Sequence, residues 1–363
     1  MAIELRPYRP EDAAALLDLR NRVFETDHGV PYLEWKAASN PAGPMHSWLA
    51  WENGALIGQY AALPMHLKIG NGYQTGYQVV DSMVAPEARA GLSKGRLFGR
   101  LAIASFQDYQ RIHLPVAYGF PNHLARAYGR EILHYEDIGA LTKLVKPLQL
   151  ASAAGELPGG KMTRVSLSLL FEVYSASLRV KNRWKVRTQK DSVFRTSRFP
   201  AETDAVAAEY LSRYPLAVAR TSAYLNWRYS NHPVFRYQIY EARDERAKPR
   251  CWLVGRTLRT DRGTEGCLMD WIADPSDGDV ARRLASLVVA AEEDFRADGA
   301  ARIVTYYLGD PWMSNLLQRL GYLVRSNAKE IFLVGRTWSD SVSLSMLKNP
   351  VNWYATIGDC DGW

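Results

Sequence analysis

The chain has 363 residues, which is too long for one ordinary hydrophobic core, so we expect two domains. Hydrophobic residues make up 47% and charged residues 23% of the chain, a balance that excludes an intrinsically disordered protein. The net charge of +7 favours anionic partners. Because no known nucleic-acid-binding pattern accompanies this charge, we do not expect nucleic acid among them.

The chain also lacks the signals of a membrane, secreted or metal-binding protein. No apolar run approaches the roughly 18 residues that cross a bilayer, and the N-terminal residues are typical of a strand and a helix rather than of a signal peptide. Cys251, Cys267 and Cys360 have no metal-ligand spacing and cannot all pair. We therefore expect a cytoplasmic protein without a metal site, and we leave open whether it forms a homo-oligomer.

The first half predicts a mixed sheet with helices on its faces, which is an α/β fold. The turn Glu52-Asn53-Gly54 is a strong hairpin signal. In chain order we expect a strand at 3–6, a helix at 10–24, strands at 47–51, 56–64 and 65–69, and a long strand that ends at residue 84.

A basic, glycine-containing turn follows this long strand. Pro86 ends the strand, and the turn from Arg89 to Gly95 leads into a helix that begins near Arg96. A helix N-terminus offers backbone N–H groups and the positive end of a dipole to an anion. Arg89, Lys94 and Arg96 add positive charge at the same place. The pattern predicts a site for a pyrophosphate group.

The second half repeats this order of elements with weaker signals. We expect strands at 192–199, 235–241, 252–258, 266–272 and 301–308, helices at 203–214, 281–297 and 312–320, and a closing strand at 329–334. Asp274, Asp277 and Asp279 stand where phosphates would need cations, so we expect no phosphate site there.

Four segments follow from this reading. They are an N-terminal domain at 1–150, a linker with a basic bridging helix at 151–190, a C-terminal domain at 191–340 and a tail at 341–363.

Two motifs carry a resemblance to a known family. Val84-Ala-Pro86 with Arg89 stands before the basic turn, and Asn122-x-x-Ala125-x-x-Tyr128 opens a later helix. Both resemble motifs of the GNAT superfamily of acyl-CoA-dependent N-acyltransferases. Further phrases, from Tyr118 to Asn122 and from Tyr224 to Tyr229, are similar to a two-domain bacterial branch. The resemblance implies two tandem GNAT-like domains, of which the second is degenerate.

The resemblance also implies a set of contacts to acetyl-CoA or another acyl-CoA. The backbone of Ser82, Met83 and Val84 would face the thioester carbonyl, and Asn122 the pantetheine arm. Tyr128 would be the general acid for the departing thiolate. The pyrophosphate would be held by the turn and the helix start, through Arg89, Gly91, Ser93, Lys94, Gly95 and Arg96.

Asp81 is the candidate base or acceptor-binding residue. It stands in the otherwise hydrophobic strand 79–84, and burial there would raise the pKa of its carboxyl towards a value suited to removing an ammonium proton. A structural ion pair is the alternative. Tyr118, Trp227 and Arg228 are candidates for binding the acceptor, although Trp227 and Arg228 also suit a domain interface. The tail from Asn352 is expected to fold back over the acceptor cleft.

We therefore expect direct, sequential transfer of an acyl group, most simply acetyl, to a primary amine. The resemblance favours an amino sugar or a sugar-nucleotide as the acceptor. Two alternatives stay open: an aminoacyl- or peptidyltransferase of the two-domain kind, and a non-catalytic binding protein. The second rests on Leu92 and Lys94, which stand where the family motif has glycines.

Overall fold

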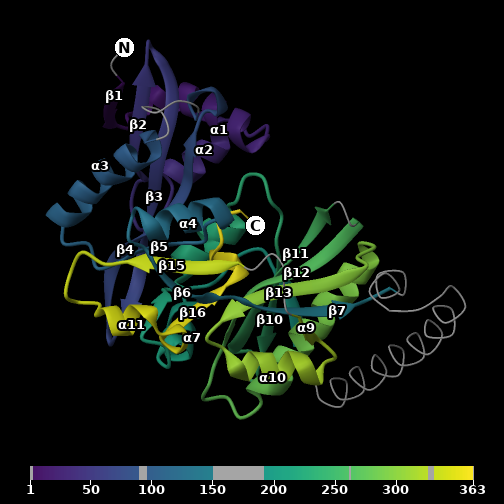
Figure 1. Ribbon diagram of the computed structural model, residues 1–363. Coiled ribbons are helices and arrows are strands. Elements are labelled where there is room, and N and C mark those ends of the chain that lie inside the picture. The colour runs from purple at the N-terminus through teal and green to yellow at the C-terminus, as the bar shows by residue number, and fades with distance from the viewer. Residues whose placement is uncertain (1–2, 90–95, 150–191, 261–262, 326–330, 363) are drawn as a thin grey trace, which may run out of the picture.

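The structure is a computed structural model that describes residues 3–89, 96–149, 192–260, 263–325 and 331–362 (Figure 1). The expected bridging helix of the segment 151–190 lies outside these ranges. No helix in the described ranges is both long enough and apolar enough to cross a membrane.

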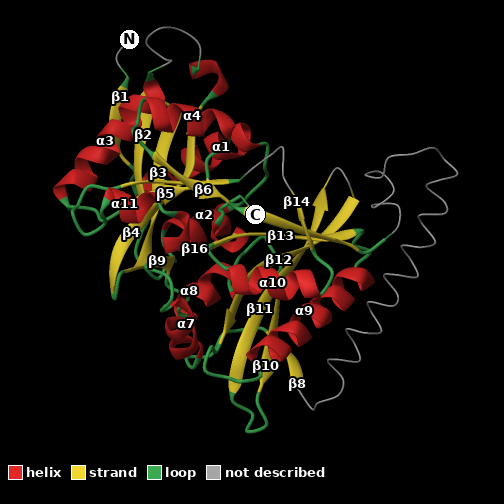
Figure 2. Ribbon diagram, turned by 60° about the horizontal axis from the view of Figure 1, so that its bottom comes forward, coloured by secondary structure: helices red, strands yellow, loops and turns green. Residues whose placement is uncertain are grey.

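The first half of the chain contains seven described strands, most of which form a curved sheet with helices on both sides. Its strands are β1 (Glu4–Pro7), β2 (His46–Glu52), β3 (Ala55–Ile69), β4 (Gly72–Val84), β5 (Ala117–Gly119), β6 (Glu136–Ala140) and β7 (Thr142–Pro147). Its helices are α1 (Ala13–Phe24), α2 (Val30–Ala37), α3 (Leu97–Arg111) and α4 (His123–Glu131), with single 3-10 turns at Pro10–Asp12 and Pro86–Ala88. Helix α3 lies on one side of β2 and β3, and α1 and α2 lie on the other (Figures 1 and 2).

The second half has the same kinds of element. Its strands are β8 (Ser192–Thr196), β9 (Leu216–Val218), β10 (Gln238–Arg243), β11 (Pro249–Thr260), β12 (Gly263–Ala273), β13 (Arg302–Leu308), β14 (Leu323–Arg325), β15 (Phe332–Arg336) and β16 (Trp353–Thr356). Its helices are α7 (Thr203–Leu211), α8 (Ser222–Leu225), α9 (Val280–Ala297), α10 (Pro311–Arg319) and α11 (Leu344–Lys348), with a π-helical turn at Asn226–Ser230 and 3-10 turns at Pro350–Asn352 and Ile357–Asp359. Helix α9 packs on β10, β11 and β12 (Figure 2).

The β2–β3 hairpin forms at the predicted turn, where Asn53 and Gly54 both have positive φ, 53° and 79°. The expected break between strands 56–64 and 65–69 is wrong, because β3 runs unbroken through Pro64. Strand β2 pairs with β3 only up to Ala62, and β9 pairs only from Leu67. Pro64 is tolerated because no strand lies beside it on that edge.

Strands are exchanged between the two halves of the chain. Strand β7 pairs with β13 and β14 of the second half, whereas β15, the yellow arrow of Figure 1, pairs with β5 and β6 of the first. The prediction that residues 329–334 close the sheet of the second half is therefore wrong, because β15 pairs with strands of the first half. Strands β9 and β16 then connect β3 to β13, so that a single sheet joins both halves. The domain boundaries that we expect from the sequence stay a prediction.

Two parallel strands of the first half separate after a short contact. Strand β4 pairs with β5 only from Tyr77 to Val79, opposite Ala117 to Gly119. Beyond this point β4 continues to Val84, whereas β5 ends and the chain turns through Phe120 and Pro121. The two strands thus diverge at one end of the sheet.

A buried ion cluster fixes the C-terminal segment to the sheet. The Arg220 guanidinium donates to Asp270 Oδ2 at 2.9 Å and to Asp359 Oδ2 at 2.6 Å, and all three side chains are buried. Burial and the neighbouring Asp270 raise the pKa of Asp359 although Arg220 opposes them. The cluster thereby connects the segments after β9 and β16 to β12.

Replacing Arg220 by Ala should lower the free energy of unfolding by about 3–5 kcal/mol, because two buried carboxylates would lose their counter-ion. Urea denaturation at neutral pH measures this change. Replacing Arg22, whose ion pairs with Asp18 and Glu87 are exposed, should cost less than about 1 kcal/mol. Equal losses in the two variants would contradict the structural role of the cluster.

Candidate functional site

A cavity of approximately 500 Å³ opens where β4 and β5 separate. Its walls come from β3, β4 and β5, from the helices on both sides of the sheet, from β15 and from the C-terminal segment. The lining residues are Arg20, Phe24, Thr26, His28, Tyr32, Tyr60, Gln78, Val79, Val80, Asp81, Ser82, Phe98, Gly119, Phe120, Pro121, Asn122, Ala125, Arg126, Gly129, Leu133, Tyr135, Phe235, Val334, Cys360, Asp361 and Gly362. The cavity therefore passes between the diverging strands and reaches both faces of the sheet.

A β-bulge marks the middle of this cavity. The pairing of β3 with β4 shifts between Gln59, opposite Met83, and Ala61, opposite Val80. Asp81 and Ser82 thus both lie opposite Tyr60, and Asp81 has a positive φ of 41°. A bulge leaves backbone groups of its extra residue outside the ladder. Because β5 no longer pairs with β4 here, backbone N–H groups at the bulge can donate to a ligand between the strands.

Two helices begin at the rim of the cavity, as the sequence predicted. Helix α3 begins at Leu97, next to Arg96, and the Asn122 side chain caps α4 by accepting from the Ala125 N–H at 2.9 Å. Arg89 and Arg96 are exposed, and Arg89 Nε donates to the Val84 carbonyl at 2.9 Å. The predicted contacts Gly91, Ser93, Lys94 and Gly95 lie outside the described residues.

A cluster of charged side chains forms the other wall of the cavity, on the side of α1 and α2. Asp81 Oδ2 accepts from Lys36 Nζ at 2.6 Å and from Arg20 Nε at 3.2 Å. Lys36 Nζ also donates to Asp361 Oδ2 at 2.5 Å. The cluster brings together residues from two helices, a strand and the tail, and its two positive charges balance its two negative charges.

The expected rise in the pKa of Asp81 is wrong. Burial does raise the pKa of this carboxyl, but the charges and hydrogen bonds of Lys36 and Arg20 outweigh burial and hold the pKa below its ordinary value. Asp361 and Asp81 likewise outweigh the burial of Lys36 and raise its pKa. Asp81 is therefore an ion-paired carboxylate at neutral pH and a poor proton acceptor.

His28 is a cavity residue that the sequence analysis missed. Its ring stacks on Tyr32 with 4.2 Å between ring centroids, and burial, with the charge of Arg20, lowers the pKa of the imidazole. A neutral imidazole at this position can accept a proton. No local signal identifies His28, since only the folded chain brings it into the same cavity as Asp81 and Asp361.

The remaining predicted residues do not line the cavity. Tyr118 is buried against Trp353, and Met83 and Val84 are absent from the lining. Tyr128 is half-buried; its ring packs edge-on against Phe98, and its hydroxyl lies against Gly99 in the first turn of α3.

Trp227 and Arg228 join parts of the structure behind the cavity. The Trp227 indole stacks on Trp35 with 4.8 Å between centroids, and each indole N–H donates to the other residue's carbonyl. Arg228 donates to the carbonyls of Gly358 and Cys360 at 3.0 and 3.1 Å. Arg228 thereby holds the C-terminal tail in place. Cys360 and Asp361 of this tail line the cavity, so the tail folds back over it.

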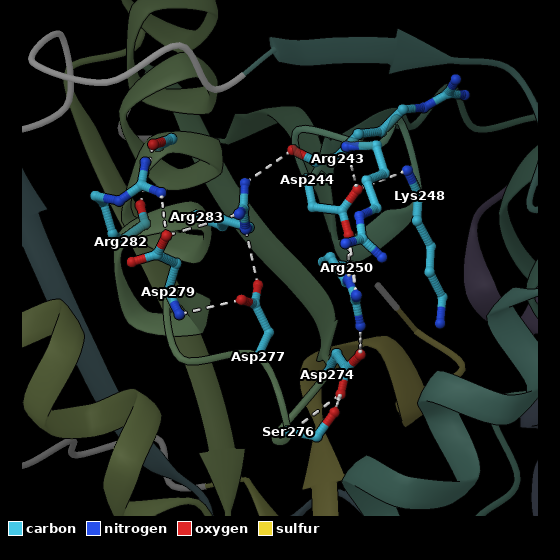
Figure 3. A network of polar contacts seen from close by, with 12 residues as sticks. Arg243, Asp244, Lys248, Arg250, Asp274, Ser276, Asp277, Asp279, Arg282 and Arg283 are labelled. Carbon is cyan, nitrogen blue, oxygen red and sulfur yellow. Dashed lines mark hydrogen bonds and ion pairs between the residues drawn. The ribbon is translucent and has the colours of Figure 1, made fainter.

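The loop between β12 and α9 occupies the corresponding place in the second half (Figure 3). Its carboxylates are neutralised by arginines, because Asp274 pairs with Arg250, Asp277 with Arg283 and Asp279 with Arg282, at 2.5 to 2.8 Å. The expectation that no phosphate binds at this loop stays a prediction.

Two backbone amides of the loop already donate to carboxylates of the same loop. The Ser276 N–H donates to Asp274 Oδ1 at 3.0 Å, and the Asp279 N–H donates to Asp277 Oδ1 at 3.1 Å. Its own carboxylates thus occupy the positions that an anion would take. In the described ranges, no group of three or more His, Cys, Asp or Glu side chains is placed to hold a metal ion.

Comparisons with known proteins agree with this geometry. Residues 4–132 match the model of the acetyltransferase (GNAT) domain. No curated protein sequence matches the chain.

Solved structures match nearly the whole chain at low sequence identity. A probable N-acyltransferase from Enterococcus faecalis is 11% identical, with a TM-score of 0.63, and the match covers 93% of this chain and 73% of that one. A GCN5-related N-acetyltransferase from Anabaena variabilis is 13% identical, with a TM-score of 0.64 and the same coverage. N-myristoyltransferase from Saccharomyces cerevisiae, with bound myristoyl-CoA, is 13% identical, with a TM-score of 0.58, covering 92% of this chain and 82% of that one.

At these identities the structural matches show a shared fold. Residues 4–132 are thus similar to the GNAT acetyltransferase domain, and the chain as a whole shares its mixed α/β fold with these N-acyltransferases.

Proposed function

We propose that the protein is an acyl-CoA-dependent N-acyltransferase that transfers an acyl group directly to a primary amine. The observation that carries this proposal is the cavity between β4 and β5, which runs from the N-termini of two helices to the cluster of Asp81, Lys36 and Asp361. Such a passage admits an anionic cofactor from one side of the sheet and an amine from the other.

The cofactor side suits the pyrophosphate and the pantetheine arm. Helix α3 begins next to the exposed Arg96 and carries the cavity residue Phe98 in its first turn, and Arg89 is exposed in the preceding segment. The contacts that the family resemblance implies at Gly91, Ser93, Lys94 and Gly95 lie outside the described residues. Asn122 stands at the rim of the cavity while it caps α4, so that its amide N–H₂ is left to face the pantetheine arm.

The reaction requires few groups. The amine lone pair attacks the thioester carbonyl carbon and forms the C–N bond; the C–S bond then breaks, and the thiolate takes a proton. Backbone N–H groups at the bulge of Asp81 and Ser82 would stabilise the oxyanion. A covalent cysteine intermediate is not part of the proposal, because burial raises the pKa of the Cys360 thiol in the cavity wall to about 12.

Proton transfer would use residues on opposite sides of the thioester. Tyr128, beside the first turn of α3, is the proposed acid for the thiolate. The neutral imidazole of His28 is the proposed acceptor of the proton that the amine loses. The paired carboxylates of Asp81 and Asp361 would bind the amine rather than deprotonate it.

The aromatic side chains near this cluster suit a sugar ring. Phe24, Tyr32 and Phe235 line the cavity together with Asp361, and aromatic faces beside hydrogen-bonding groups are suited to stack on sugars. We therefore keep an amino sugar or a sugar-nucleotide as the proposed acceptor.

Replacing both Arg89 and Arg96 by Ala should weaken CoA binding about tenfold or more, because each can supply a charge-assisted contact to the pyrophosphate. Isothermal titration calorimetry with CoA measures the dissociation constant. Arg111 is exposed at the opposite end of α3, so Arg111→Ala should leave it unchanged. No heat from the unaltered protein would refute the proposed function.

Replacing Tyr128 by Phe should lower kcat about 10²-fold if the hydroxyl protonates the thiolate. The KM for acyl-CoA should change little, since the ring and its packing on Phe98 remain. Thiol release during turnover measures both constants once an amine acceptor is found by screening amino sugars. Tyr73→Phe, at an exposed position on β4, is the control; unchanged kcat in Tyr128→Phe would exclude the acid role.

Replacing Asp81 by Asn should raise the KM for the amine at least tenfold and leave the dissociation constant of CoA unaltered. The substitution removes one carboxylate from the amine side of the cavity and leaves Lys36 paired with Asp361 alone. Steady-state kinetics and calorimetry separate the two effects. A loss of CoA binding would mean that Asp81 maintains the fold instead.

A further inference from the structure

We propose that the cavity holds an acyl group larger than acetyl, namely an aliphatic chain of medium length, and that β15 forms part of its wall. This inference rests on the proposed function and names the class of acyl donor. It follows from the division of the cavity into a charged end and an apolar end.

The apolar end lies on the side of α3 and α4. It is formed by Tyr60 of β3, Phe98 of α3, Leu133 and Tyr135 after α4, and Val334 of β15. The two tyrosine hydroxyls lie 2.9 Å apart and share one hydrogen bond, so each hydroxyl already has a polar partner within the protein. Arg126 also lines the cavity, but its guanidinium donates to both carboxylate oxygens of Asp137, at 2.8 and 2.7 Å.

The register of the strands places this end at the thioester. Tyr60 lies opposite the bulge of Asp81 and Ser82, where the carbonyl would bind. Val334 lies opposite Gly119, the last residue of β5 that pairs with β4. The apolar end therefore begins at the point where the acyl group leaves the sulfur.

Polarity decides which reactant occupies each end. Burying an amine or a phosphate among Tyr60, Phe98 and Val334 would leave a polar group without a partner, which is costly. Burying methylene groups there is favourable, and the gain grows with the apolar area removed from water. The opposite end, with Arg20, Asp81 and Asp361, is suited to the amine.

The volume is larger than acetyl requires. An apolar cavity of about 150 Å³ holds the six carbons of benzene, or roughly 25 Å³ per carbon. On the same scale an eight-carbon chain needs about 200 Å³, which is less than half of the approximately 500 Å³ available. The remainder accommodates the end of the pantetheine arm and the amine.

Because β15 pairs with strands of the first half, it contributes to specificity for the acyl chain in this proposal. Val334 comes from the last part of the chain, yet it lies beside Gly119 and Asp137 of the first half. Substitutions at Val334 should change the preferred chain length without touching the pyrophosphate end of the site.

Calorimetry with CoA, acetyl-CoA, octanoyl-CoA and tetradecanoyl-CoA tests this inference on the full-length protein. We expect octanoyl-CoA to bind at least tenfold more tightly than acetyl-CoA and tetradecanoyl-CoA to gain nothing further. Val334→Phe should remove the advantage of octanoyl-CoA and keep the affinity for CoA. Val334→Ala, which enlarges the cavity, should extend the preference to longer chains.

Val324→Phe provides the matched control, because Val324 is an exposed residue of β14 outside the cavity. Equal affinities for CoA, acetyl-CoA and octanoyl-CoA would overturn the acyl assignment and leave the proposed function standing. A further gain for tetradecanoyl-CoA would overturn the medium length. Failure of CoA itself to bind would overturn the proposed function and this inference together.

Discussion

The candidate site depends on the early end of pairing between β4 and β5. Both strands contain features that prevent a longer ladder: the bulge at Asp81 in β4, and Pro121, which lacks a backbone N–H, after β5. Strand β15 pairs with the other edge of β5. The gap between β4 and β5 thus follows from the backbone pairing of three strands.

Because strands are exchanged, residues from both halves of the chain line the cavity at this gap. Strand β15 supplies Val334, and the tail supplies Asp361. The tail reaches the cavity because Arg220 holds Asp359 and Arg228 holds the carbonyls of Gly358 and Cys360. Gln78 of β4 adds a hydrogen bond to the Asp359 carbonyl at 2.5 Å. The first half alone would therefore lack walls on two sides of its cavity.

Local features of the site could be predicted from the sequence. Asn53-Gly54 specifies a hairpin, Asn122 caps α4, and α3 begins next to Arg96, because each feature depends on residues close together in the chain. The partners of β15 and the ion pairs of Asp81 could not be predicted in this way. These contacts join residues that are far apart in the chain. Lys36 and Asp361, for example, are 325 residues apart.

The two halves show how similar strand–loop–helix units come to differ in function. In the first half, Arg89 and Arg96 are exposed beside the N-terminus of α3. In the second, Asp274 and Asp277 accept hydrogen bonds from the loop's own N–H groups, and arginines outside the loop pair with the same carboxylates. A carboxylate held within the loop is always present at a high effective concentration, so a dissolved phosphate cannot displace it easily. The second loop thus holds anions of its own, which is the physical reason for expecting no phosphate site there.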